Sequence, residues 1–235
     1  MSSNRRRFLE AAAANAAAFA VLPGVAFAGA PALRSLPHDV MLGEAGDDTS
    51  LEEWDLAWAD RITGKHKAVF DITETESGIG VWRGAIWVNQ YTDVMKAAPA
   101  DFSPVLVIRH NAIVLAMQQA YWDRYNAGEL QKVTHPLTGE TAKKNPVLLD
   151  ERDGVPAPYN NMALHKQIAR GATVLACNLA LRECIGTIMR AEKISQPEAR
   201  KQAIAYLVPG VILQPSGVFA VIRAQEAGAA YIKAS

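Results

Sequence analysis

Residues 103–110 read SPVLVIRH, a short apolar run that ends in a charged and a titratable side chain. The run predicts a buried strand, because its β-branched and apolar residues occupy consecutive positions rather than alternate ones. Consecutive apolar positions are typical of strands that are covered on both faces. The stretch therefore predicts a strand of a parallel sheet.

The same pattern recurs along the chain, and segments with helical character separate the runs. The predicted strands are KAVFDIT (67–73), SPVLVIRH (103–110), ATVLAC (172–177), GVILQPS (210–216) and AAYIKA (229–234). Helices are predicted within residues 74–98 and over residues 111–126, 162–171, 179–194, 196–207 and 217–228. This alternation predicts an α/β fold with three layers, in which helices cover both faces of a mostly parallel five-stranded sheet.

The first 28 residues have the character of an export signal. The residues that match a twin-arginine motif are Arg5, Arg6, Phe8 and Leu9. An Ala-rich stretch follows, and Ala26-Phe27-Ala28 fits a small-x-small cleavage site. The alternative is an amphipathic or membrane-anchoring segment, but the stretch is too short and too weakly apolar to span a bilayer well. We therefore expect the twin-arginine export machinery as a partner, cleavage near Ala28, and a periplasmic mature chain without a stable membrane span.

Composition favours one domain after the signal. Removing 28 of the 235 residues leaves 207, which is enough for a sizeable core. We expect a linker and a short helix over residues 29–64 and the main domain over residues 65–235. Frequent glycine and proline in residues 127–160 predict an insertion loop. Lys plus Arg equals Asp plus Glu at 24 each, so no basic face for nucleic acid is predicted.

Parallel strands end at one edge of a sheet, where ligands of such folds bind. Cys177 ends a predicted strand and opens a helix, whose free N–H groups stabilise a thiolate. It is either a nucleophile or persulfide carrier, or a small residue at a tight corner. His110 either acts as a base, or holds this thiolate as an ion pair, or caps the corner between its strand and helix. The candidate ligand-binding residues at this edge are Asn111, Asn178, Ser216 and Gly217.

The last two of these residues begin a predicted helix. Gly217 and its neighbours offer N–H groups to an anion in one interpretation, and Ser216 is an ordinary N-cap in the other. The segment Ser77–Gly80 forms only part of a dinucleotide-binding fingerprint, so no cofactor is predicted.

Cys177 and Cys184 are the only cysteines of the chain. On one helix their separation would be about 10 Å, whereas a disulfide needs Cα atoms within about 7 Å. A zinc site needs about four ligands, and two thiols at this spacing match no common zinc motif. We therefore expect no disulfide and no metal site, and we assign Cys184 to the core of its helix.

Three stretches resemble the DsrE/DsrF-like sulfur-relay family. They are VLVIRHNAIVLAM (105–117), ARGATVLACNLAL (169–181) and LVPGVILQPSGVFAVIRAQEAGAAYIK (207–233). The last stretch is the most specific, with Pro-Gly before a strand, Pro-Ser-Gly after it, and a final Tyr-Ile-Lys. The resemblance runs from about His66 to Lys233, and it implies a three-layer α/β protein that assembles as a homotrimer or hexamer. It also implies that Cys177 matches the cysteine that carries persulfide in some members.

This chain departs from the sulfur-relay members in two respects. It has the insertion at residues 127–160 and a lengthened segment at residues 179–207, and it has an export signal, whereas their partners are cytoplasmic. The first hypothesis is therefore a periplasmic oligomer that binds a small ligand or a partner without catalysis. The alternative is a sulfane-sulfur carrier, whose only chemistry would be sulfur transfer through Cys177, and a redox module comes third. An exposed sulfur near His110 would favour the carrier, and a buried one would favour the binding protein.

Overall fold

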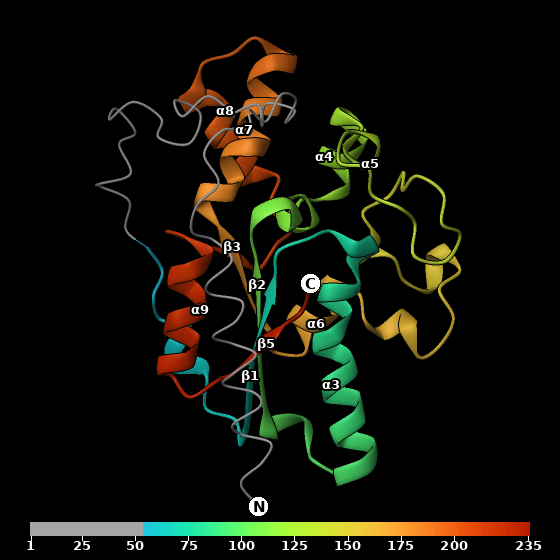
Figure 1. Ribbon diagram of the computed structural model, residues 1–235, viewed down its shortest axis with the longest axis vertical. Coiled ribbons are helices and arrows are strands. Elements are labelled where there is room, and N and C mark those ends of the chain that lie inside the picture. The colour runs from blue at the N-terminus through green and yellow to red at the C-terminus, as the bar shows by residue number, and fades with distance from the viewer. Residues whose placement is uncertain (1–53) are drawn as a thin grey trace, which may run out of the picture. The chain divides into compact units, whose positions relative to one another are not determined.

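The computed structural model describes residues 54–235, and Figure 1 shows how their helices and strands are arranged. The twin-arginine motif, the cleavage site near Ala28 and the linker up to residue 53 lie outside the described residues. Between residues 54 and 235, no helix is long and apolar enough to cross a membrane.

Five strands form one sheet in the order β4-β3-β2-β1-β5. Their bounds are His66–Ile72 for β1, Phe102–Ile108 for β2, Thr173–Cys177 for β3, Val211–Gln214 for β4 and Ala230–Lys233 for β5. Each neighbouring pair is parallel. The prediction of an α/β fold with a five-stranded sheet is confirmed, and this sheet is parallel throughout.

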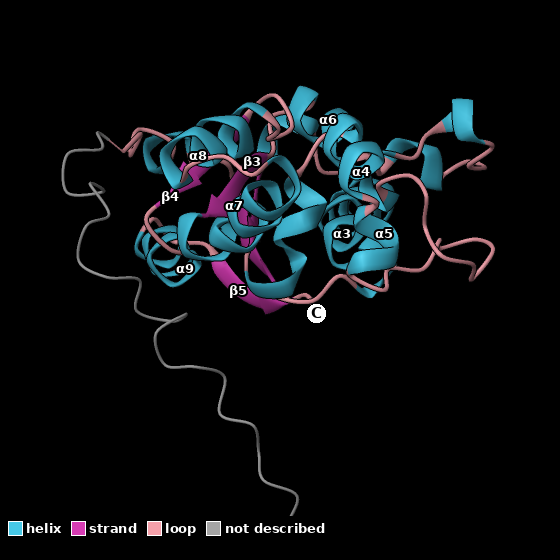
Figure 2. Cartoon of the chain, turned by 90° about the horizontal axis from the view of Figure 1, so that it is seen from above, coloured by secondary structure: helices cyan, strands magenta, loops and turns pink. Residues whose placement is uncertain are grey.

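Helices cover both faces of the sheet. Their bounds are Ile79–Met95 for α3, Gln119–Tyr125 for α4, Ala127–Leu130 for α5, Leu164–Ala169 for α6, Asn178–Glu192 for α7, Gln196–Ala205 for α8 and Gly217–Glu226 for α9. Helices α3 and α6 lie on one face and α9 lies on the other (Figures 1 and 2). Helices α7 and α8 pack against each other beyond the carboxyl end of β3.

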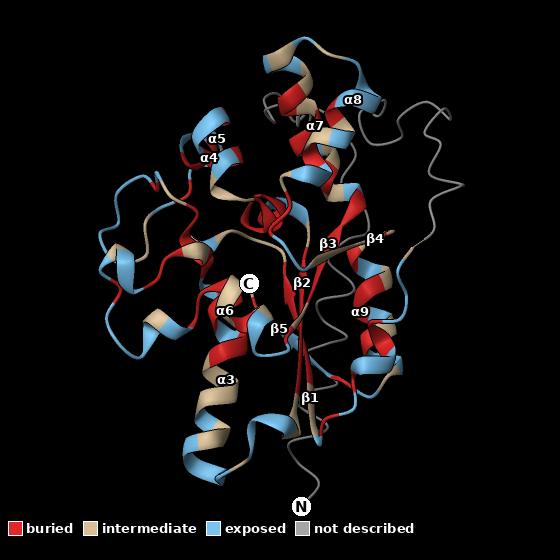
Figure 3. Ribbon diagram, turned by 180° about the vertical axis from the view of Figure 1, so that it is seen from behind, coloured by how far each residue is buried: buried red, intermediate tan, exposed pale blue. Residues whose placement is uncertain are grey.

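The sheet separates two apolar cores. Successive side chains of a strand point to opposite faces, so Phe70 and Ile72 pack in the core that includes α7, whereas Val69 packs with Trp58 and α9. Figure 3 shows buried residues running along the central strands. Burial on both faces is the physical reason for the consecutive apolar residues in the strand sequences.

The prediction of one continuous helix over residues 111–126 is wrong. The segment forms a 3-10 helix over His110–Ala116 and then breaks at Met117 before α4 begins. Tertiary hydrogen bonds compete with the helix here: the N–H of Val208 donates to the carbonyl of Ala116 at 2.9 Å, and the N–H of Gln118 donates to the carbonyl of Tyr206 at 2.7 Å. These two bonds hold the segment in an extended conformation at the point where a helix would need the same groups.

Candidate functional site

The carboxyl ends of the parallel strands meet at one edge of the sheet, where ligands of such folds bind. At this edge the chain leaves β1 towards α3 on one face, and it leaves β4 towards α9 on the other. Ala234 and Ser235 cover the edge at the ends of β1 and β5: the N–H groups of Thr73 and Glu74 donate to Ser235 Oγ at 2.8 and 2.9 Å, and Ala234 is fully buried.

A buried carboxylate lies beneath this cover. Asp71 is 3% exposed. Arg109 donates to it from Nε at 2.7 Å and from a terminal nitrogen at 2.8 Å, and Tyr231 donates from its hydroxyl at 2.9 Å. The hydrogen bond from Arg109 to Asp71 raises the pKa of Arg109, and smaller contributions come from the neighbouring Tyr231 and Cys177. The guanidinium that reaches this edge is therefore already neutralised by a partner within the protein.

The Asp71–Arg109–Tyr231 cluster was not predicted from the sequence. Its one local signal is Asp71 itself, an acidic residue inside the apolar run KAVFDIT. A charge in a buried strand requires a partner, but the run does not identify which arginine or tyrosine supplies it.

The first residues of α9 pack against the same arginine. A Cβ atom on Gly217 would lie 2.3 Å from Cδ of Arg109. The arginine side chain packs directly against residue 217, so any residue larger than glycine would clash with it there. Ser216 Oγ accepts a hydrogen bond from the N–H of Phe219 at 3.0 Å. Ser216 is thus the N-cap of α9, as one of its two interpretations predicts.

Cys177 is the last residue of β3 and the N-cap of α7. Its sulfur accepts a hydrogen bond from the N–H of Ala180 at 3.4 Å, and the residue is 6% exposed. The next residue, Asn178, is also buried, and its side-chain oxygen accepts a hydrogen bond from Arg200 at 2.7 Å. Cys184 is buried in the core, as predicted.

His110 and Asn111 gather around a different residue, Glu74. The Nδ1 atom of His110 lies 3.3 Å from one carboxylate oxygen of Glu74, and the amide of Asn111 donates to the other at 2.8 Å. The imidazole is 62% exposed. In the part of the chain that the structure describes, no hydrogen bond joins His110 to Cys177, so the structure does not bring these two predicted residues together as a catalytic pair.

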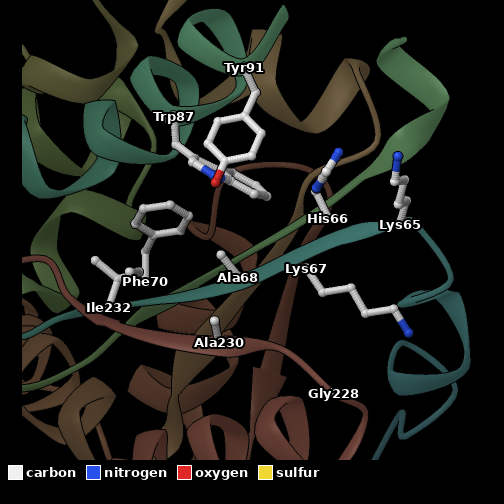
Figure 4. A pocket seen from close by; sticks show the side chains of 10 residues that line it. All are labelled: Lys65, His66, Lys67, Ala68, Phe70, Trp87, Tyr91, Gly228, Ala230 and Ile232. Carbon is white, nitrogen blue, oxygen red and sulfur yellow. The ribbon is translucent and has the colours of Figure 1, made fainter. Parts of the chain in front are cut away.

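A groove lies at the opposite, amino-terminal half of the sheet, between α3 and β5. We call it the β5 groove; its volume is about 700 Å³, within the range of about 300–1,000 Å³ that is common for small-ligand sites. Figure 4 shows the side chains that line it, among them Lys65, His66, Ala68, Trp87, Tyr91 and Ala230. None of these residues was predicted as a site, because they come from separate segments and form no sequence motif.

Aromatic rings form the walls of the β5 groove. The rings of His66 and Tyr91 meet edge-on at a centroid distance of 5.1 Å. Trp87 lies 5.8 Å from Phe70 and 5.4 Å from Phe102. These contacts hold the rings in fixed positions, so the groove is largely preformed.

Comparisons with known proteins do not assign the chain to a family. No family model matches the sequence, and no curated protein matches it. Within residues 54–235, no three or more His, Cys, Asp or Glu side chains lie in a group that could hold a metal ion.

Proposed function

We propose that this protein binds a small, flat aromatic molecule in the β5 groove. The observation that carries the proposal is the floor of the groove, where Ala68 and Ala230 are cross-strand partners on β1 and β5. Two small neighbouring side chains leave room for a ring that Leu or Ile would fill. Trp87 and Tyr91 stand over this floor (Figure 4), so a ring that enters would contact aromatic side chains.

The polar groups at the groove favour a ligand that carries a polar or anionic substituent. Within the described residues, Lys65 forms no ion pair and the hydroxyl of Tyr91 has no hydrogen-bond partner. The imidazole of His66 lies beside Tyr91 and offers a further donor or acceptor. A few convergent polar groups on an apolar surface are typical of small-molecule sites.

At the carboxyl edge, Cys177 and Arg109 favour neither catalysis nor the binding of an anion. Cys177 is buried, and the charge of Arg109 is paired with Asp71. A nucleophile must be accessible to its substrate, and an arginine that recognises an anion must be free of an internal carboxylate. Neither condition is met at this edge.

The proposal is tested with 2-naphthol, titrated by isothermal calorimetry. Ala230→Leu fills the floor from an exposed edge strand, and we expect it to weaken binding at least about tenfold. Ala205→Leu, at an exposed position on α8, is the matched control and should bind as the wild type does. Equal affinity for the wild type and Ala230→Leu would exclude the groove as the binding site.

The second candidate function is sulfane-sulfur carriage on Cys177. It is supported by the hydrogen bond from the N–H of Ala180 to the sulfur, because such a donor at the start of α7 would stabilise an anionic sulfur. Persulfide mass spectrometry on the purified wild type and on Cys177→Ala tests it. A sulfur adduct of equal abundance in both proteins would rule it out.

We further propose that the chain is an exported, periplasmic relative of the DsrE/DsrF-like proteins and that it assembles as a homotrimer or hexamer. The proposal is supported by the order of Arg5, Arg6, Phe8 and Leu9, and by the three stretches that carry the resemblance. A parallel α/β/α arrangement is compatible with it. Arg5→Lys combined with Arg6→Lys should retain the protein in the cytoplasm, and light scattering after size exclusion should give the mass of three or six chains.

A further inference from the structure

A second groove lies on the other side of α3, and we call it the α6 groove. Its volume is about 370 Å³. Helix α3 contributes a stripe of residues one turn apart, and the segment that follows α6 closes the opposite side. The residues used below are Ala85, Val88, Asn89, Thr92, Phe102 and Arg170. The apolar members offer a surface for an apolar group, and the polar members are available to a ligand.

Arg170 is the only one of these six residues that is charged. One of its terminal nitrogens donates to the carbonyl of Asn161 at 2.6 Å. Among the described residues it forms no ion pair with a carboxylate, in contrast to Arg109. Partial burial lowers the pKa of Arg170, and no acidic neighbour contributes to that pKa. A guanidinium has five N–H donors, so most of its donors remain open to a ligand.

Asn89 and Thr92 add neutral polar groups to the same groove. Both side chains are half-buried, and within the described chain neither makes a hydrogen bond. They lie three residues apart on α3, and positions at this spacing share one face of a helix. Polar side chains that are partly removed from water and unpaired gain free energy when a ligand supplies their hydrogen bonds.

We propose that the α6 groove binds a small monocarboxylate with an apolar body, which Arg170 holds by its carboxylate. Guanidinium and carboxylate match in shape and form paired hydrogen bonds. Val88, Ala85 and Phe102 would contact the apolar body. No second Lys or Arg lines the groove, so a single negative charge fits it better than a phosphate dianion.

The test compares two ligands that differ in charge but hardly in shape, cyclohexanecarboxylate and cyclohexanecarboxamide. Isothermal calorimetry on the full chain should show the carboxylate binding at least about tenfold more tightly than the amide. Arg170→Gln should remove this preference. The matched control is Arg61→Gln, because Arg61 is exposed and lies outside the groove, and it should retain the preference.

Two further variants test carboxylate binding in the α6 groove if Arg170→Gln is too unstable to be measured. Thr92→Val and Asn89→Leu keep the side-chain shape, and each should weaken carboxylate binding several-fold. Ala230→Leu closes the β5 groove and should leave carboxylate binding unchanged, which separates this inference from the proposed function. Equal binding of the two ligands, or an unchanged preference in Arg170→Gln, would overturn the inference.

Discussion

At the scale of single residues, Asp71 places a buried charge at the carboxyl edge of the sheet. It is buried and accepts hydrogen bonds from Arg109 and Tyr231. Asp71→Asn removes the negative charge and leaves Arg109 without its counter-ion. We expect the free energy of unfolding to fall by about 3 kcal/mol, since breaking a buried ion pair leaves one charge uncompensated. Urea denaturation followed by circular dichroism measures this loss.

Two variants define the origin of that loss. Tyr231→Phe removes one hydrogen bond to the carboxylate and should cost about 1.5 kcal/mol. Asp60→Asn alters an exposed aspartate and should change stability by less than about 0.5 kcal/mol. If Asp71→Asn proves as mild as Asp60→Asn, the cluster does not stabilise the carboxyl edge.

At the scale of elements, Asn145 links the segment of residues 127–160 to the backbone that follows β2. Its side chain is fully buried and donates to the carbonyls of Leu115 and Met117 at 3.0 and 2.7 Å. Asn145→Leu keeps the number of heavy atoms and the branching at Cγ but leaves both carbonyls without a donor. We expect the free energy of unfolding to fall by about 2–3 kcal/mol and proteolysis within residues 127–160 to be faster, both measured against the wild type.

The control for this element is a second asparagine with the same substitution. The side chain of Asn89 on α3 has no hydrogen-bond partner within residues 54–235, so Asn89→Leu should change the free energy of unfolding by less than about 0.5 kcal/mol. Similar losses for the two variants would mean that the volume of the side chain matters at residue 145, rather than its hydrogen bonds.

At the scale of the whole molecule, the core makes stability depend on pH in the alkaline range. Burial raises the pKa of the Cys184 thiol to about 12. Near pH 8 both the folded and the unfolded chain keep this proton. Between about pH 8.5 and pH 12 the unfolded chain loses it while the folded chain keeps it, so the free energy of unfolding falls by up to about 1.4 kcal/mol per pH unit.

Denaturation midpoints between about pH 8 and about pH 10.5 check this prediction. Burial also raises the pKa of Tyr121, which adds a similar dependence on pH. The contribution of the thiol is therefore the difference between the wild type and Cys184→Ala, whose stability should decline less steeply with pH. Parallel curves for the two proteins would show that Cys184 contributes nothing to this dependence.

Local pattern was sufficient to predict the strands and most helices. Runs such as VLVI (105–108) and VLA (174–176) are apolar at every position, and burial on both faces of a sheet is the condition that produces such runs. The prediction of a continuous helix over residues 111–126 failed because tertiary contacts, rather than local pattern, decide the structure of that segment. Those residues have a helical pattern, but Asn145, Tyr206 and Val208 bind the backbone groups that a continuous helix would use.

The site was less accessible to prediction than the fold. The sequence could place Cys177 at the end of a strand and identify Ser216 as an N-cap, because these positions depend on neighbours in the chain. It placed His110 at the end of a strand as well, whereas β2 ends at Ile108. It could not show that His110 pairs with Glu74 or that Cys177 is buried. Sequence alone determined the succession of strands and helices along the chain, since periodicity is a property of adjacent residues. Only the tertiary structure decided the Asp71–Arg109 pair and the two grooves beside α3, because charge pairing and empty volume depend on distances between residues that are far apart in the chain.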